Sequence, residues 1–164
     1  MSNPPTRILV TGSAGYIGSH AALRLVEDGC EVIGLDDFTR GNPGAVTAIK
    51  EVAENAPGNY TFVEGSIGDR TRVESLLREH DIELVMHFAA LAYVGESVHE
   101  PLRYYDINTG GAVILLRAVE SAGVNRFVFS STCATYGEPA AELIPIAEEC
   151  PQNPINPYGR SKLV

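Results

Sequence analysis

The stretch Thr11-Gly12-Ser13-Ala14-Gly15-Tyr16-Ile17-Gly18-Ser19-His20 places three glycines between two segments of clear hydrophobic pattern. Before it, Arg7-Ile8-Leu9-Val10 is a short aliphatic run, typical of a strand buried on both faces of a parallel sheet. After it, apolar residues between Tyr16 and Asp28 recur at spacings of three or four, which predicts a helix that ends at Gly29. A strand, a glycine turn and a helix in direct succession indicate a phosphate-binding βα unit.

Each glycine of this turn is expected to meet a separate physical need. Gly12 permits a backbone conformation closed to other residues, Gly15 lets the main chain approach a pyrophosphate, and Gly18 lets helix and strand pack closely. The amide groups at the start of the helix, at Tyr16 and Ile17, then face the phosphates, aided by the helix dipole. The turn is therefore predicted to bind the pyrophosphate of a dinucleotide.

Predicted strands and helices alternate along the rest of the chain. Strands are expected at residues 31–35, 60–64, 84–88 and 127–130, and helices at 45–55, 71–80 and 101–121. The alternation predicts an α/β fold, a Rossmann-like doubly wound parallel sheet with helices on both faces. A length of 164 residues suits one domain that spans residues 1–164.

The composition is that of an ordinary globular protein, with 45% hydrophobic and 20% charged residues. A formal net charge of -9 argues against binding to nucleic acid or to an anionic membrane. The sequence has neither a signal-peptide pattern at its start nor an apolar run that could span a bilayer, so a cytoplasmic location is expected. The three cysteines, Cys30, Cys133 and Cys150, are odd in number and far apart, so neither a disulfide framework nor a metal site is expected.

Asp36 ends the second predicted strand, 18 residues after Gly18. A carboxylate at this place accepts hydrogen bonds from ribose hydroxyls and repels a 2′-phosphate, so NAD is expected rather than NADP. Arg40 in the following loop leaves NADP open, because a guanidinium could accommodate that phosphate. Asp37 is expected to be a second contact or a solvated neighbour.

Ala89 and Ala90 follow the strand predicted at 84–88. Small residues at the carboxyl end of a central strand let a cofactor lie close to the backbone. His87 lies on the same strand and is expected to be a packed, hydrogen-bonded histidine rather than a catalytic base.

Three segments resemble a known family. The spacing G-x-x-G-x-x-G after Thr11 resembles the short-chain dehydrogenase/reductase superfamily, and Gly-Tyr-Ile-Gly-Ser-His resembles its extended sugar-nucleotide branch. Residues 87–97, His-Phe-Ala-Ala-Leu-Ala-Tyr-Val-Gly-Glu-Ser, and residues 130–137, Ser-Ser-Thr-Cys-Ala-Thr-Tyr-Gly, are similar to segments of UDP-glucose 4-epimerases. Residues 92–97 and 130–139 also resemble UDP-arabinose (xylose) 4-epimerases, so the sugar stays open.

The resemblance implies that NAD is bound along the carboxyl ends of the strands. The implied cofactor-binding residues are Gly12, Gly15, Tyr16, Ile17, Gly18, Asp36, Asp37, Ser66, Ile67, Phe88, Ala89, Ala90, Asn108, Ser130, Tyr158 and Lys162. Ser66 stands where the family usually has an acid that contacts adenine, while Ile67 is expected to pack against the ring. Asn108 matches an asparagine of the family's Asn-x-x-Gly pattern.

The implied catalytic residues are Thr132, Tyr158 and Lys162. Asn156 as N-cap and Pro157 at the first position predict a helix start, and the Tyr-x-x-x-Lys pair follows on one helical face. By resemblance, Tyr158 takes a proton from the sugar C4 hydroxyl as hydride moves to NAD, and Thr132 holds the oxygen. Lys162 favours the phenolate form and binds the nicotinamide ribose. The resulting 4-keto intermediate is then reduced on its other face, which makes the enzyme an isomerase.

Two other functions are weighed against this one. Related sugar-nucleotide 4,6-dehydratases carry an Asp-Glu pair just after the hydroxyl residue, whereas this chain has Cys133 and Ala134, which cannot supply that acid and base. A catalytically silent NAD-binding module stays open, although such modules often lose the Tyr/Lys pair.

The resemblance spans residues 8–163 and also bears on what lies outside them. It implies a smaller C-terminal domain that binds the UDP-sugar and is absent from this chain, so the fold is expected to be C-terminally truncated. The family's homodimer contact and the activity are expected to be impaired in the 164 residues alone.

Overall fold

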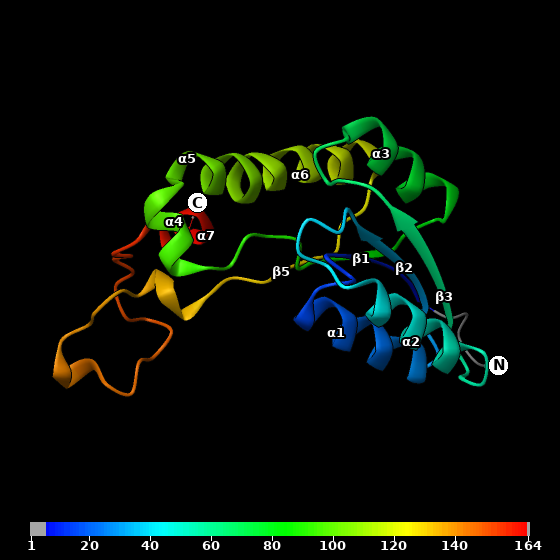
Figure 1. Ribbon diagram of the computed structural model, residues 1–164, viewed down its shortest axis with the longest axis horizontal. Coiled ribbons are helices and arrows are strands. Elements are labelled where there is room, and N and C mark those ends of the chain that lie inside the picture. Colours follow the sequence, from blue (N-terminus) through cyan, green and yellow to red (C-terminus); the bar gives the residue numbers. More distant parts are fainter. Residues whose placement is uncertain (1–5, 164) are drawn as a thin grey trace. The chain divides into compact units, whose positions relative to one another are not determined.

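The computed structural model describes residues 6–163, in which strands and helices alternate as expected (Figure 1). The strands are β1 (Arg7–Thr11), β2 (Glu31–Asp36), β3 (Asn59–Glu64), β4 (Leu84–His87) and β5 (Phe127–Phe129). The α-helices are α1 (Tyr16–Glu27), α2 (Pro43–Ala53), α3 (Arg70–Glu79), α4 (Val94–His99), α5 (Pro101–Tyr104), α6 (Gly111–Ala122) and α7 (Pro157–Leu163). Three further turns are the π-helix η1 (Tyr105–Gly110) and the 3-10 helices η2 (Cys133–Thr135) and η3 (Ala141–Leu143). None of the described helices is long and apolar enough to cross a membrane.

The chain folds into two compact units. The first comprises residues 6–89 and Val113–Ser130, and the second comprises Ala90–Ala112 and residues 131–163. The sequence-based assignment of one domain to residues 1–164 stays a prediction.

A five-stranded parallel sheet in the order β3-β2-β1-β4-β5 forms the centre of the first unit. The chain fills the sheet from β1 outward to β3, then returns to the other side of β1 with β4. This reversal between β1 and β4 is the topological switch point at which such sheets bind ligands, beyond the carboxyl ends of the strands. Thr11 pairs with His87 at that end of the two strands.

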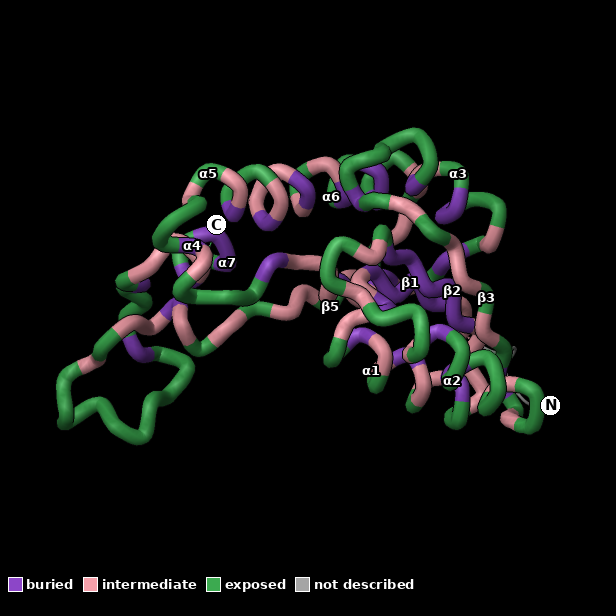
Figure 2. Tube along the Cα trace, in the orientation of Figure 1, coloured by how far each residue is buried: buried purple, intermediate pink, exposed green. Residues whose placement is uncertain are grey.

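Helices cover both faces of this sheet, which confirms the predicted doubly wound fold (Figure 1). Because successive strand residues point to opposite faces, Leu9 packs with residues of α3 and α6, whereas Ile8 and Val10 pack with residues of α1 and α2. Buried residues accordingly run along the central strands in Figure 2. The central strands are buried on both faces, so each appears in the sequence as a nearly continuous apolar run that predicts a strand.

The helix ends follow local chemistry. Asn42 caps α2 by accepting a hydrogen bond from the Gly44 amide at 2.9 Å, and Asp69 caps α3 by accepting one from the Arg72 amide at 3.0 Å. Gly29, with φ 89°, lies just beyond α1 in the left-handed region that favours glycine. The helices predicted at 45–55 and 71–80 therefore begin slightly earlier than expected, at Pro43 and Arg70, the residues that directly follow these caps.

One predicted helix is wrong. The single helix expected over 101–121 is divided into α5, the π-helix η1 and α6. A π-helix has a wider turn than an α-helix, and such turns occur frequently at functional sites. Here it contains the buried residue Asn108. Helix α7 packs against α4, α5, η1 and η2 within this unit.

Candidate active site

The glycine turn lies too close to α1 and to the segment after β4 for side chains at two of its positions. Gly12 has φ 71°, and a Cβ atom added there would lie 2.6 Å from the backbone nitrogen of Ala89. A Cβ atom added at Gly18 would overlap the carbonyl oxygen of Gly12. Both positions therefore require glycine, as the sequence pattern predicts.

The start of α1 is chemically suited to an anion. Its N-cap residue is Gly15, and no side chain among the described residues caps this helix. Tyr16 and Ile17, the first two helical residues, are 85% and 58% exposed. Backbone amides without helical partners, at the positive end of the helix dipole, fit the pyrophosphate of a dinucleotide.

Asp36 connects the end of β2 to the glycine turn. Its Oδ2 accepts a hydrogen bond from the Ala14 amide at 3.0 Å, and its Oδ1 accepts one from the Phe38 amide at 2.8 Å. Burial raises the pKa of Asp36, while the two backbone hydrogen bonds act in the opposite direction. A carboxylate has about four acceptor positions, so Asp36 retains capacity for ribose hydroxyls. Its neighbour Asp37 is exposed and accepts a hydrogen bond from the Thr39 amide at 2.9 Å.

The turn after β3 holds the two residues expected near adenine. Ser66 is exposed, and its Oγ accepts a hydrogen bond from the Gly68 amide at 3.2 Å. Ile67 is buried among the core residues that lie between the sheet and α3. Their adenine contacts stay predictions.

The carboxyl end of β4 confirms the interpretation of His87. This side chain is buried, and its Nδ1 lies 2.7 Å from Thr11 Oγ1. The Ser130 amide donates a hydrogen bond to the His87 carbonyl at 3.2 Å, so the end of β5 lies beside it. Phe88 and Ala89 follow, both partly exposed. His87 is thus a structural histidine between two strand ends.

Helix α7 begins as predicted and presents the Tyr/Lys pair of the second unit. Asn156 Oδ1 accepts a hydrogen bond from the Gly159 amide at 2.8 Å, and Pro157 occupies the first helical position. Tyr158 and Lys162 lie one helical turn apart. Lys162 is 5% exposed, and burial lowers its pKa to about 8. A lysine with a lowered pKa is typical of active sites.

Thr132 lies at the start of η2, next to α7. Its Oγ1 accepts a hydrogen bond from the Ala134 amide at 3.2 Å, and its carbonyl accepts one from Thr135 Oγ1 at 2.8 Å. A Cβ atom added at Gly159 would lie 2.5 Å from the Ala134 carbonyl oxygen, so α7 and η2 pack backbone to backbone. The second unit therefore brings the elements that carry Thr132, Tyr158 and Lys162 together.

Asn108 has a bracing role that the sequence did not reveal. Its amide nitrogen donates to the Leu91 carbonyl at 2.9 Å and to Ser161 Oγ at 3.0 Å, and its Oδ1 accepts from the Leu91 amide at 2.8 Å. Ser161 Oγ in turn donates to the Tyr158 carbonyl at 2.8 Å. Both amide hydrogens of Asn108 are thus used inside the protein, and its cofactor contact stays a prediction. Ala90, which precedes Leu91 in the chain, is partly exposed.

The chain resembles known proteins over nearly its whole length. It is 50% identical over 157 residues to the probable UDP-arabinose 4-epimerase 3 of Oryza sativa subsp. japonica, and the match covers 96% of this chain and 38% of that protein. It is 45% identical to the UDP-glucose 4-epimerase of Bacillus subtilis (strain 168), with 96% of this chain and 45% of that protein covered. The chain therefore spans less than half the length of these curated relatives.

Solved structures give the same result. A UDP-glucose 4-epimerase from Stenotrophomonas maltophila, crystallised with bound NAD and formylated UDP-arabinopyranose, matches with a TM-score of 0.89 and 42% identity. The match covers 96% of this chain and 46% of that one. The family model described as GDP-mannose 4,6 dehydratase matches residues 9–164. The chain thus belongs to this family of extended short-chain dehydrogenases/reductases.

Proposed function

We propose that the protein is an NAD-dependent UDP-sugar 4-epimerase, an isomerase that inverts C4 through a 4-keto intermediate. Helix α7 carries this proposal, because it places Tyr158 and Lys162 one turn apart, with the lysine buried. The glycine turn and Asp36 supply the features that a dinucleotide needs, and a carboxylate at the end of β2 favours NAD over NADP. The two curated relatives named above are UDP-sugar 4-epimerases.

The proposed chemistry divides between the cofactor and the protein. When bound, NAD would accept the C4 hydride and return it to the other face of the sugar. Tyr158 takes the proton of the C4 hydroxyl as base and later returns one as acid, and Thr132 holds the C4 oxygen. Lys162, one helical turn from Tyr158, binds the nicotinamide ribose, and its ammonium stabilises the negative charge that develops on the Tyr158 oxygen during proton transfer.

The family name refers to a dehydratase, but the residues here support epimerisation. Elimination of water needs an additional acid and base after the hydroxyl residue. Cys133 and Ala134 occupy those positions, and the methyl side chain of alanine can act neither as an acid nor as a base.

The substrate is proposed at the level of UDP-sugars. The Bacillus subtilis relative, at 45% identity, is named for UDP-glucose, and the rice relative, at 50% identity, is named for UDP-arabinose. The higher identity favours testing UDP-arabinose as a second substrate. A homodimer is proposed on the family resemblance alone.

The test uses two proteins: the 164-residue chain, and the same chain followed by the part of the Bacillus subtilis protein beyond the matched region. Each is assayed with UDP-galactose and UDP-arabinose in the presence of NAD. We expect turnover in the extended protein, and at least a hundredfold loss of kcat in Tyr158→Phe and Lys162→Ala, because both remove groups that act in the transition state. Tyr105→Phe, at an exposed tyrosine of η1, is the matched control.

Two outcomes would contradict the proposal, and a third would contradict a separate expectation. Full activity in Tyr158→Phe would mean that another group carries the proton. Bound NAD without turnover of either sugar, in a folded extended protein, would indicate a catalytically silent module. Turnover by the 164 residues alone would contradict the expectation that a second domain is needed.

A further inference from the structure

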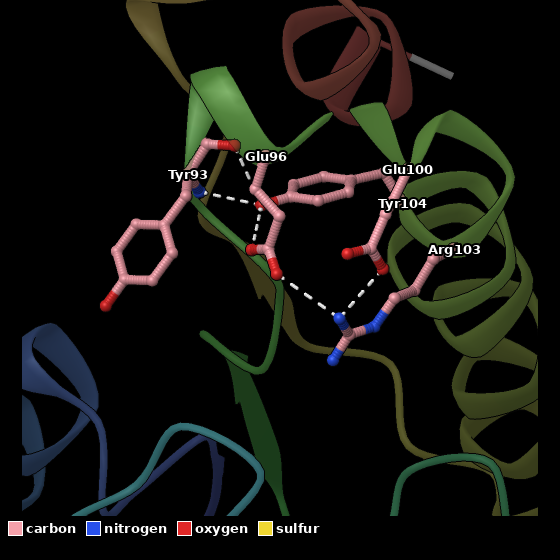
Figure 3. Close-up of polar contacts among 5 residues, drawn as sticks. All are labelled: Tyr93, Glu96, Glu100, Arg103 and Tyr104. Carbon is pink, nitrogen blue, oxygen red and sulfur yellow. Dashed lines mark hydrogen bonds and ion pairs between the residues drawn. The ribbon is translucent and has the colours of Figure 1, made fainter. Parts of the chain in front are cut away.

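The second unit contains a polar network that the proposed chemistry does not use. It joins the backbone of Tyr93 to the side chains of Glu96, Glu100, Arg103 and Tyr104 (Figure 3). Its centre is the Tyr104 side chain, which is 0% exposed. A buried hydroxyl needs hydrogen-bond partners, and this one has several.

The Tyr104 hydroxyl has both a hydrogen-bond donor and hydrogen-bond acceptors around it. It accepts a hydrogen bond from the Tyr93 amide at 3.0 Å and lies within donating distance of the Tyr93 carbonyl, at 2.8 Å, and of Glu96 Oε2, at 2.9 Å. One hydroxyl proton is donated to one acceptor at a time. A carboxylate is the stronger acceptor, because hydrogen bonds to charged groups are about twice as strong as neutral ones.

Arg103 holds Glu96 in place for this contact. Its Nη1 donates to Glu96 Oε1 at 3.2 Å and to Glu100 Oε2 at 3.0 Å (Figure 3). The Glu96 side chain is 20% exposed and the Glu100 side chain is 50% exposed. Both carboxylates therefore share one guanidinium group, but Glu96 is the more buried and also contacts Tyr104.

The ring of Tyr104 lies beside the proposed base. Its centroid is 6.4 Å from that of Tyr158, and the two ring planes meet at 81°. This edge-to-face arrangement is a preferred geometry for aromatic pairs. Ser161 and Asn108 brace the backbone of Tyr158, whereas Tyr104 contacts its ring.

We propose that Tyr104, held by Glu96 and Arg103, is a positioning residue that fixes the ring of Tyr158 in the orientation needed for proton transfer. The rate part of this proposal rests on the function proposed above. A displacement of about 1 Å in a reacting group can cost roughly a hundredfold in rate. A ring held on one side by a rigid neighbour is protected against such displacement.

Glu96→Gln and Glu100→Gln form a matched pair of variants. Each removes one carboxylate from Arg103, but only the first also changes the partner of Tyr104. A glutamine side chain has one acceptor oxygen, so it cannot accept from both Arg103 and Tyr104 in the geometry that a carboxylate allows. Tyr104→Phe makes the reciprocal change and keeps the ring.

The first measurement needs no turnover. In the labelled 164-residue chain, the NMR signals of the Tyr158 ring are assigned with Tyr158→Phe, and the ring-flip rate is measured. We expect the rate to rise at least tenfold in Glu96→Gln and Tyr104→Phe and to stay unchanged in Glu100→Gln. Equal rates in the two glutamine variants would overturn the inference, even if the protein has no epimerase activity.

The second measurement separates positioning from binding. In the extended protein, kcat is expected to fall roughly tenfold in Glu96→Gln and in Tyr104→Phe, with KM for the UDP-sugar and the affinity for NAD unchanged. Melting temperatures confirm that each variant is folded. Unchanged kcat in Glu96→Gln, or an equal loss in Glu100→Gln, would overturn the inference. An inactive parent protein would contradict the proposed function instead, and the ring-flip rates would then decide.

Discussion

The glycine turn of the first unit and helix α7 of the second unit are held in place by different kinds of contact. In the turn, the Gly12 amide donates to the Leu35 carbonyl at 2.8 Å, and neighbouring backbone atoms approach too closely for a side chain. In contrast, α7 is joined to η1 by Asn108 and Thr109, whose side chains bond to Ser161. The glycine turn depends on close backbone packing, whereas α7, which also packs its backbone against η2, depends in addition on which side chains meet.

This difference decides how each region responds to substitution. A Cβ atom added at a closely packed glycine cannot rotate away from the neighbouring backbone atom, so the backbone itself must move and the effect on binding is large. A side-chain brace can be removed one hydrogen bond at a time, at about 1 kcal/mol each. Substitutions at the closely packed glycines of the turn are therefore expected to impair NAD binding strongly, and those around α7 are expected to act in steps.

The largest effect is expected for Gly18→Ala. Its Cβ atom would overlap the Gly12 carbonyl oxygen, and relief requires α1 to move away from β1. We expect a loss of at least about 3 kcal/mol in NAD binding, which is more than a hundredfold in affinity. Calorimetric titration of the 164-residue chain measures this, and NADP is titrated in parallel because Asp36 is expected to disfavour it.

Gly95→Ala is the matched control, since a Cβ atom added there meets nothing within 4 Å. It lies in α4 of the second unit and is expected to leave NAD affinity unchanged while stabilising the helix by roughly 0.5–1 kcal/mol. Equal loss of NAD binding in both variants would show that close backbone packing does not distinguish the two positions. Tighter binding of NADP than of NAD would instead point to Arg40.

Each unit also buries one charged group of the candidate site. Asp36 accepts two backbone hydrogen bonds, which partly offset the cost of its burial. For Lys162, burial is the cause of a pKa lowered from 10.5 to about 8. A lowered pKa means that the folded state disfavours the ammonium, so Lys162 is expected to decrease stability at neutral pH.

The next effect is therefore pH-dependent. Below about pH 8, Lys162 is protonated in both the folded and the unfolded state, so the full cost of burying its ammonium reduces stability. Between about pH 8 and 10.5, Lys162 loses its proton in the folded state but keeps it in the unfolded state, so stability rises with pH. Lys162→Met is expected to stabilise the chain by roughly 3 kcal/mol at pH 7, and this gain should disappear by about pH 10.5. Urea unfolding at the two pH values measures the difference.

Lys50→Met, at an exposed lysine of α2, is the control and is expected to change the unfolding free energy by less than about 0.5 kcal/mol at either pH. A gain in Lys162→Met that does not depend on pH would show that the methionine stabilises by packing rather than by removing a buried charge.

The sequence predicted the first unit nearly completely. Glycine spacing and strands that are apolar on both faces are local signals, and they predicted the sheet, its helices and the place of Asp36. The caps at Asn42 and Asp69, which set where α2 and α3 begin, were not predicted. In the second unit, the start of α7 was equally readable, because Asn156 and Pro157 are adjacent in the chain.

The π-helix and the braces around α7 were not predictable from the same signals. Asn108 and Ser161 are separated by 53 positions, and Tyr104 meets Tyr158 across a similar distance in the sequence. Nothing in the residues next to Asn108 indicates that its amide is used inside the protein. Side-chain contacts between distant segments leave no periodic pattern, and they are the part that only a structure supplies.

The smallest effect is expected where the two units use the same device. Asn42-Pro43 begins α2 and Asn156-Pro157 begins α7, and in each case the asparagine Oδ1 accepts a backbone hydrogen bond, at 2.9 Å and 2.8 Å. Asn42→Ala and Asn156→Ala are therefore each expected to reduce the free energy of unfolding by about 1 kcal/mol.

The effects of the two variants on activity should nevertheless differ, because α7 carries Tyr158 and Lys162, whereas α2 carries no candidate site residue. In the extended protein, Asn156→Ala is expected to lower kcat several-fold and Asn42→Ala to leave it unchanged, with urea unfolding and steady-state kinetics measured on the same samples. Equal loss of stability with equal loss of kcat would mean that overall stability, rather than the position of α7, sets the rate.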